Sequence, residues 1–278
     1  MNVLILGAKG TLGTELMEIF PGSFGWDKED CDVTNMQQLQ SKMGEVKDQI
    51  DTVINCVAYN DVDGAESHTE MAVLLNSTVP KNLAQICKDL GFTLVHFSTN
   101  FVFDGQKGEY IEKDEVNPQS IYGQSKVLGE RAVLEAKCKA YVVRTSVLFG
   151  KKGLSPSSKR SFVDIMLDLS TSTNEVRAIK DEVNSVTYVV DLAQAVKNLL
   201  EAKPEYGIYH LTNSGQASWF DFAQEIFKLK HSHVVTVPIL GKEMPRKAPR
   251  PKKAVLINTK LPQLRPWQEA LNEFLMTN

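Results

Sequence analysis

Several features that would narrow the function are absent from this 278-residue chain. Its four cysteines, at positions 31, 56, 87 and 138, form no Cys-x-x-Cys pair, and its five histidines have no spacing typical of a zinc site. Internal repeats are missing as well. The sequence therefore predicts free thiols in a reducing cytoplasm and no metal.

Long apolar runs and an excess of one charge are also lacking. No segment is apolar over the length that a bilayer requires, and the run Val3–Leu6, without a basic leader, is too short for a signal peptide. The formal net charge of −3 gives no reason to expect nucleic acid or an anionic membrane as a partner. We expect a cytoplasmic protein that binds neither; a homodimer is compatible with the sequence.

What the first half does contain is an alternation of short apolar runs and helical patterns. The runs lack the polar alternation of half-exposed strands, which is typical of strands buried on both faces, and lie at 3–6, 52–55, 93–97 and 141–144. The clearest helical patterns are 81–90, which Gly91 is positioned to end, and 126–135. This order predicts an α/β protein with a Rossmann-like, doubly wound parallel sheet.

The pattern loosens after Gly150. Residues 151–159, which contain Gly, Pro and Ser, indicate a loop. Beyond it we expect helices at 162–169, 190–201, 220–228 and 266–276, and extended segments at 208–211 and 234–238. We interpret residues 1–150 as the dinucleotide-binding domain. Residues 151–278 are then mainly a smaller C-terminal substrate lobe, with some elements returning to the main sheet.

A glycine-rich turn joins the first strand to a helical segment. Gly7, Gly10 and Gly13 follow the strand directly, and Thr14–Phe20 has a helical pattern. Glycines permit a tight turn, let the backbone approach a pyrophosphate, and allow close helix packing, while the helix N-terminus offers free N–H donors. In this context the spacing predicts a dinucleotide site, although a glycine turn without a ligand is the alternative.

An acidic residue follows at the distance expected for the second strand. Asp27 comes after Phe24–Trp26 and would accept hydrogen bonds from the adenosine ribose hydroxyls. A carboxylate there would repel a 2′-phosphate, so it slightly favours NADH over NADPH, and Lys28 beside it softens the preference. A solvated turn residue is an equally good interpretation of Asp27.

A tyrosine and a lysine four residues apart begin another helix. Tyr122 and Lys126 share one helix face, and an ammonium near a phenol stabilises the phenolate. The preceding strand ends in Thr99, at the carboxyl edge where ligands of open α/β sheets bind. These three residues predict a catalytic site in which Thr99 holds a substrate carbonyl beside Tyr122. An exposed helix pair and a strand-capping threonine are the structural alternatives.

Together these motifs resemble the extended short-chain dehydrogenases/reductases, and within them the dTDP-4-dehydrorhamnose reductase family. The resemblance spans nearly the whole chain, through residues 7–13, 55–59, 62–66, 98–105, 122–126, 161–163, 187–193, 207–211, 218–219 and 250–251. It implies that Gly10, Thr11 and Leu12 touch the cofactor diphosphate. It further implies that Asp32 and Val33 lie by the adenine and that Cys56, Val57 and Ala58 line the path to the nicotinamide.

The family's reaction is reduction of the C4 ketone of a nucleotide-linked 6-deoxy-4-keto sugar, most often dTDP-linked. On this resemblance, Tyr122 protonates the oxygen after hydride transfer from NAD(P)H, and Thr99 orients it. Arg250 presents a fork suited to the diphosphate of a sugar nucleotide, although a solvated basic loop explains it equally well.

The departures from the family pattern fall on the substrate side. Asn100 and Phe101 replace a common Asp-Tyr pair, and Val147 replaces a usual tryptophan. Ser161 replaces a frequent asparagine, and residues 181–187 lack the usual glutamine and proline. We predict that Asn100 and Val147 lie in the substrate pocket.

Two other functions stay open. One is a non-catalytic, NAD(P)-binding regulatory subunit, because the β subunit of methionine adenosyltransferase is similar to these reductases. The other is a sugar-nucleotide epimerase or dehydratase. Dehydratases have acidic residues just after the threonine, which Asn100 and Phe101 do not supply.

Overall fold

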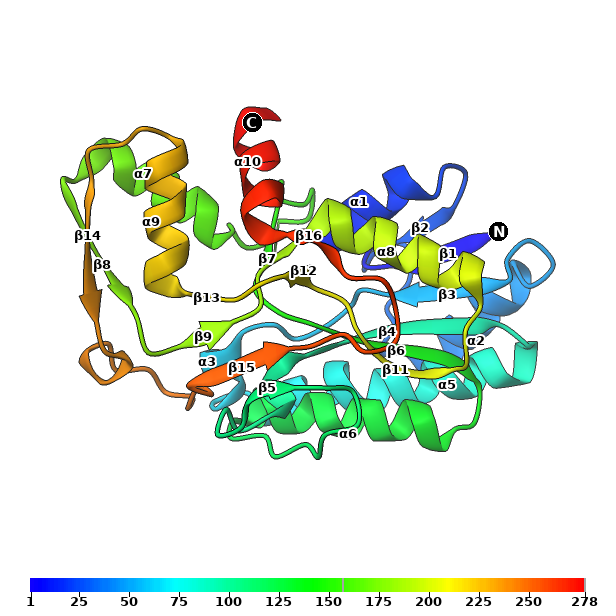
Figure 1. Ribbon diagram of the computed structural model, residues 1–278. Helices are drawn as coiled ribbons and strands as arrows, with labels where there is room; N and C mark the ends of the chain where they lie inside the picture. Colours follow the sequence, from blue (N-terminus) through cyan, green and yellow to red (C-terminus); the bar gives the residue numbers. More distant parts are fainter. Residues whose placement is uncertain (157, 278) are drawn as a thin grey trace.

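The structure, a computed structural model, describes residues 1–156 and 158–277. Within this part of the chain six parallel strands form the main sheet, in the order β11-β6-β4-β3-β1-β2. Their bounds are β1 Val3–Leu6, β2 Phe24–Trp26, β3 Thr52–Asn55, β4 Thr93–Thr99, β6 Lys139–Thr145 and β11 Gly207–His210. Figure 1 shows this sheet between layers of helices. The doubly wound parallel sheet predicted from the sequence is confirmed.

Strand β1 shows why these strands are continuous apolar runs. Side chains alternate between the faces of a strand, so Val3 and Ile5 enter one core cluster while Leu4 and Leu6 enter the other. All four are at most 1% exposed. A strand covered on both faces needs an apolar residue at every position.

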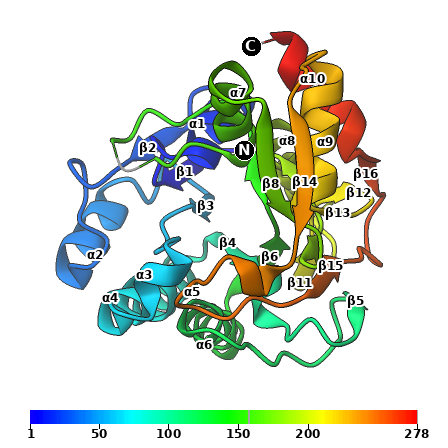
Figure 2. The same ribbon diagram turned by 90° about the vertical axis from the view of Figure 1, so that its left-hand side faces the viewer.

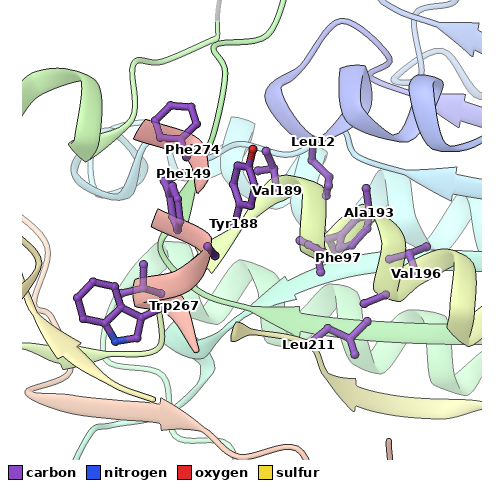
Figure 3. Close-up of a cluster of buried hydrophobic side chains, with 14 of the residues drawn as sticks. Leu12, Phe97, Phe149, Tyr188, Val189, Ala193, Val196, Leu211, Trp267 and Phe274 are labelled. Atoms are coloured by element: carbon purple, nitrogen blue, oxygen red, sulfur yellow. The ribbon is translucent and has the colours of Figure 1, made fainter. Parts of the chain in front are cut away.

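Helices cover both faces of the sheet. Helices α1 (Thr11–Ile19) and α8 (Val189–Ala202) pack against each other on one face. On the other face α5 (Val79–Leu90) lies between α2 (Met36–Glu45) and α6 (Ile121–Glu135). Figure 3 shows the first face, where Leu12 and Val196 approach Phe97 of β4. The glycine turn is therefore attached to a helix that the core holds in place.

The smaller lobe is built around short strands. Its sheet has the order β13-β9-β15-β5, and β14 pairs with β8 beside helices α7 and α9 (Figure 2). The bounds are β5 Gly108–Tyr110, α7 Phe162–Ser172, β8 Glu175–Ile179, β9 Val183–Asn184, β13 Ala217–Ser218, α9 Trp219–Leu229, β14 Val235–Ile239 and β15 Lys253–Leu256. Strand β7, Leu148–Phe149, lies at the end of the first half. The second half also contains β10 Thr187–Tyr188, β12 Asn213–Ser214, η3 Gly241–Glu243, β16 Leu264–Pro266 and α10 Trp267–Thr277.

The two halves of the sequence exchange elements. From the second half, β11 pairs with β6 in the main sheet and α8 covers that sheet. In the opposite direction, β5 of the first half pairs with β15 in the small sheet. Only the first exchange is predicted from the sequence, because the three residues of β5 are too few to show a strand pattern.

Most other expected elements are confirmed within a few residues. The helix expected at 81–90 begins two residues earlier with Pro80 in its first turn, and ends at Gly91, whose φ of 78° is left-handed. A residue without a Cβ adopts that conformation at little cost. Residues 151–156 form no helix or strand, as expected for a loop. In the described residues, no helix has the length and apolar character that a membrane span requires.

Candidate active site

The glycine turn lies at the carboxyl end of β1. Gly7 has a left-handed φ of 75° and starts the turn, and Gly10 is the N-cap of α1 without a side-chain cap hydrogen bond. A Cβ on Gly13 would lie 2.1 Å from the Gly7 carbonyl oxygen, so only glycine lets α1 approach so closely. With Thr11 and Leu12 in its first turn, this helix end has the backbone N–H groups and dipole that suit a diphosphate.

A loop from the smaller lobe lies on this turn. The Gly153 N–H donates to the Thr11 hydroxyl at 3.3 Å, and the Ser155 N–H donates to the Lys9 carbonyl at 2.8 Å. A Cβ on Gly153 would come within 2.5 Å of the Thr11 nitrogen. We call residues 151–156 the strap. In this structure the strap shares the α1 N-terminus with the surface that a diphosphate would use.

The carboxylates after β2 are held by local backbone groups. Asp27 accepts hydrogen bonds from the Lys9 N–H at 3.1 Å and the Lys28 N–H at 2.9 Å, so it lies beside the glycine turn. Asp32 accepts from the Thr34 N–H and hydroxyl, and these bonds lower the pKa of its carboxyl. Val33 is buried in the core. Asp27 is thus placed at the turn, whereas Asp32 and Val33 lie further along the loop that leads to α2.

The segment after β3 touches the turn from the other side. A Cβ on Gly7 would lie 3.2 Å from Cγ2 of Val57 and 3.3 Å from the carbonyl carbon of Cys56. The Asn55 side chain accepts from the Val57 N–H at 3.1 Å and fixes this segment, which continues through Ala58. Burial raises the pKa of the Cys56 thiol, which stays neutral.

Tyr122 and Lys126 of α6 lie near Thr99, at the carboxyl edge of the main sheet. Ser120 caps α6 by accepting from the Gly123 N–H at 3.2 Å, which places Tyr122 and Lys126 in the first turns of the helix. Both are buried, with exposures of 8% and 3%. The Lys126 ammonium donates to the Phe97 carbonyl at 3.1 Å, so it is anchored to β4, the strand that ends in Thr99.

Burial sets the charge states of this group. It raises the pKa of Tyr122 to about 12, partly offset by a hydrogen bond with Thr99. It lowers the pKa of Lys126 to about 8, opposed by the negative charge of Glu130. The phenol is therefore protonated at neutral pH, and the lysine is close to its titration range. A donor phenol beside a hydroxyl and an ammonium can protonate a carbonyl oxygen.

Asn76 is a site residue that was not predicted from the sequence. This residue lies in a π-helical turn, η1 (Leu74–Thr78), and is fully buried. Its side chain accepts from the Tyr59 N–H at 2.9 Å and donates to the Tyr59 carbonyl and the Ser125 hydroxyl, both at 3.0 Å. Asn76 thus ties the segment after β3 to α6. The signal in the sequence is an asparagine that directly follows the apolar run Met71–Leu75.

Asn100 lies beside the catalytic group, because its side-chain oxygen accepts from the Thr99 hydroxyl at 3.3 Å. Its assignment to the substrate pocket stays a prediction. The residue is 1% exposed in the turn η2 (Asn100–Val102), and its amide donates to the Asn184 side chain at 2.7 Å and to the Ala254 carbonyl at 3.0 Å. Both amide hydrogens are used, so Asn100 fastens the end of β4 to the small sheet. Phe101 instead meets Tyr122, with ring centroids 5.6 Å apart in an edge-on arrangement.

Arg250 also has a protein partner. Its guanidinium forms a two-pronged ion pair with Asp63 of α3 (Val62–Ala65), both contacts being 2.7 Å. This pair holds the pKa of the Asp63 carboxyl well below its usual range. Figure 2 shows the segment between β14 and β15 reaching α3. Arg250 therefore joins the segment before β15 to α3. Its pairing with the diphosphate of a sugar nucleotide stays a prediction.

Val147 lies in a strained turn after β6. Its φ of 41° is left-handed, a conformation that a β-branched residue adopts only at a cost. The Val147 carbonyl accepts from the Thr187 N–H at 3.0 Å, which fixes the turn. Ser161, another departure, caps α7 through a capping box with Asp164.

The fold and this site define a class of protein: a Rossmann-fold oxidoreductase of the extended short-chain dehydrogenase/reductase type. The whole chain, residues 1–278, matches the family model described as the RmlD substrate binding domain. The chain belongs to this family, that of the dTDP-4-dehydrorhamnose reductases.

Three similar proteins illustrate the family. A dTDP-4-dehydrorhamnose reductase from Clostridium acetobutylicum is 38% identical, with a TM-score of 0.93 and coverage of 100% of this chain and 99% of that one. The Bacillus anthracis reductase, solved in complex with NADP, is 33% identical with a TM-score of 0.94 and full coverage of both chains, 100% each. A probable dTDP-4,6-dihydroxy-2-methyloxan-3-one 4-ketoreductase from Streptomyces antibioticus is 36% identical over 98% of this chain and 94% of its own.

Proposed function

We propose that this protein uses NADH or NADPH to reduce the C4 ketone of a nucleotide-linked 6-deoxy-4-keto sugar. The nucleotide that we propose first is dTDP. The observation that carries the proposal is the buried group of Thr99, Tyr122 and Lys126 at the edge of the sheet that also holds the glycine turn. The family and the names of the three similar proteins support it.

The residues present fit a dinucleotide. The uncapped N-terminus of α1 suits the diphosphate, and Asp27 beside the turn suits the adenosine ribose. The residues that would hold the cofactor are Gly7, Gly10, Thr11, Leu12, Gly13, Asp27, Asp32, Val33, Cys56, Val57, Ala58, Tyr122 and Lys126. When bound, the reduced nicotinamide supplies a hydride to the carbonyl carbon.

The chain's own residues supply the proton and hold the substrate oxygen. The Thr99 hydroxyl orients the carbonyl oxygen, and the Tyr122 phenol transfers its proton to that oxygen as the carbonyl becomes an alcohol. The Lys126 ammonium stabilises the phenolate that remains, which regains a proton from water. Burial of all three keeps these interactions in a low dielectric, where they are stronger than in water.

A phenylalanine exchange at the proton donor tests the function. Tyr122→Phe removes the donated proton but keeps the ring that packs on Phe101, so we expect cofactor binding to persist and the rate to fall by about 10²- to 10⁴-fold. Oxidation of NADH and NADPH is followed with dTDP-4-keto-6-deoxyhexoses. Tyr206→Phe, a 46% exposed tyrosine after α8, is the matched control. Full activity of Tyr122→Phe would refute the assignment.

Coenzyme preference and substrate are finer parts of the proposal. We propose that NADH is slightly favoured, because the Asp27 carboxylate would face a 2′-phosphate; Asp27→Asn should then raise the NADPH to NADH ratio of kcat/KM. Asn100 and Phe101, in place of Asp-Tyr, would remove a carboxylate and a phenol from the pocket, and Val147 would remove the bulk of a tryptophan. A screen of nucleotide-linked keto sugars identifies the substrate.

The departures near Thr99 also support a second candidate, a regulatory subunit that binds NAD(P) without turnover. It predicts that no keto sugar is reduced and that the protein co-purifies with a partner enzyme. An epimerase or dehydratase would retain oxidised cofactor tightly and consume none. We further propose a cytoplasmic location, which the four free cysteines support, and a homodimer, which light scattering would test.

A further inference from the structure

A buried ion pair lies one helical turn beyond Lys126 and has no part in the steps above. Glu130 of α6 and Arg144 of β6 are each 2% exposed. Nε of Arg144 donates to Oε1 of Glu130 at 2.8 Å, and Nη2 donates to Oε2 at 2.6 Å. Nη1 of Arg144 has no hydrogen-bond partner among the described residues. Two charges are thus held far from solvent.

The pair joins the helix and the strands that carry the catalytic group. In the main sheet Arg144 is the register partner of Ser98, and the next pair is Thr99 with Thr145. The ion pair therefore fastens α6, with Tyr122 and Lys126, to the strand that neighbours Thr99.

Stability alone is a weak reason for such a pair. Desolvation of two charges offsets most of their attraction, and apolar replacements of buried ion pairs are often neutral or stabilising. The surroundings of Arg144 are apolar on one side, since its guanidinium lies 5.1 Å from the centroid of the Phe103 ring. A role in the charge of a neighbouring group explains the pair better.

Lys126 is that neighbour. Residues four apart on a helix lie on the same face, so Glu130 follows Lys126 directly. The other titratable or charged groups around Lys126 are Tyr122 on α6, Cys56 after β3, His96 on β4 and Arg144 on β6. Burial keeps the Cys56 thiol and the His96 imidazole neutral at pH 7. Glu130 is then the negative charge that opposes desolvation of the ammonium.

We propose that Glu130 is a positioning residue that keeps Lys126 charged at neutral pH, and that Arg144 fixes the carboxylate in place. This inference rests on the proposed function, because it assigns Lys126 to stabilising the Tyr122 phenolate. Without the carboxylate, the ammonium would lose its proton closer to neutrality. The phenol would then lack its charged partner.

Two variants separate charge from geometry. Glu130→Gln keeps the shape and removes the charge, whereas Glu130→Asp keeps the charge and disturbs the shape. The charge of Lys126 is followed in the cofactor-free protein by NMR titration of its ¹³Cε resonance, which is identified by its loss in Lys126→Met. We expect the midpoint to fall by about one pH unit in Glu130→Gln, a tenfold change, and to stay near the wild-type value in Glu130→Asp.

The basic limb of the pH profile of kcat/KM should follow the same shifts. An unchanged midpoint in Glu130→Gln overturns the inference even if Tyr122→Phe is inactive, so the two proposals can fail separately. A lower melting temperature with an unchanged midpoint would mean that the pair is purely structural. If Glu130→Gln does not fold, the double variant with Arg144→Met leaves no unpaired charge. In the double variant, a fall in the Lys126 midpoint that is smaller than one pH unit supports the inference. An unchanged midpoint overturns it.

Discussion

The glycine turn and the region where the two lobes meet are built in different ways. At the glycine turn the geometry comes from the backbone: the close approach of Gly13 to the Gly7 carbonyl and the left-handed Gly7. Where the lobes meet, the geometry comes from paired side chains, Arg250 with Asp63 and Asn100 with Asn184. A site made of backbone tolerates almost no added atoms. A site made of side-chain pairs can change one partner at a time.

The largest expected effect is at Gly13. A Cβ there would meet the Gly7 carbonyl oxygen at 2.1 Å, so Gly13→Ala must displace α1 from the turn. Overpacking of this kind costs about 1–3 kcal/mol, and we expect the dissociation constant for NADH to rise about 10- to 100-fold. Calorimetric titration measures it. Gly44→Ala, where a Cβ would meet nothing within 4 Å, is the control, and equal affinities of the two variants would contradict a backbone-built site.

Acid should lower the free energy of unfolding of the whole fold. Burial lowers the pKa of His96 to about 3, and it also lowers the pKa of His210. Between pH 6.5 and 5 the unfolded chain binds these protons and the folded chain does not, so the free energy of unfolding falls as the pH falls. Each histidine contributes about 1.4 kcal/mol per pH unit.

Urea unfolding at pH 7, 6 and 5 measures this loss. His96→Gln should make the dependence shallower, while the exposed His68→Gln leaves it as in the wild type. Two separate transitions at pH 5 would show that the regions unfold independently.

A smaller effect is expected at the pair that joins the lobes. If the role of Arg250 is to pair with Asp63, then Arg250→Met and Asp63→Asn should raise KM for the sugar nucleotide by the same few-fold. The double variant should have the same KM as either single variant. Arg177→Met, which breaks an exposed pair with Glu243, is the control. A much larger rise in Arg250→Met than in Asp63→Asn would instead assign the guanidinium to the diphosphate.

The smallest effect is expected at the strap. A Cβ on Gly153 would lie 2.4 Å from the carbonyl carbon of Gly10. The strap is a loop that can move away from this contact, whereas α1 is held in place by the core. Gly153→Ala should leave the melting temperature unchanged and tighten NADH binding about threefold, because a competing contact at the diphosphate surface is removed. Weaker binding would mean that the strap closes over the bound cofactor.

The same contrast explains how much could be predicted from the sequence. The buried strands, Gly7–Gly13, and the pair Tyr122 and Lys126 follow from local patterns, because periodicity and residue spacing are visible within a few positions. The partners of Asn100 and Arg250 lie 84 and 187 residues away, and the sequence alone does not show such pairs. The pairing of Asn100 with Asn184 could not be predicted for this reason, and the place of Asn100 in the substrate pocket stays a prediction.

Two further residues escaped prediction on the same grounds. Asn76 is hydrogen-bonded to Tyr59 and Ser125, and Glu130 is paired with Arg144 on another strand. A buried polar residue in an apolar helical pattern signals that a partner exists. It does not say which segment supplies the partner.

The exchange of β5 has a consequence for protein engineering. Substrate preference is often altered by moving one domain between related enzymes, with the junction placed at the end of the nucleotide-binding half. Here a graft of residues 151–278 would bring β9 and β15 without the strand that pairs with β15 through Ala254 and Leu256. The donor's Gly108–Tyr110 would have to travel with them. The small sheet of this protein is therefore transferable only as two discontinuous pieces of chain.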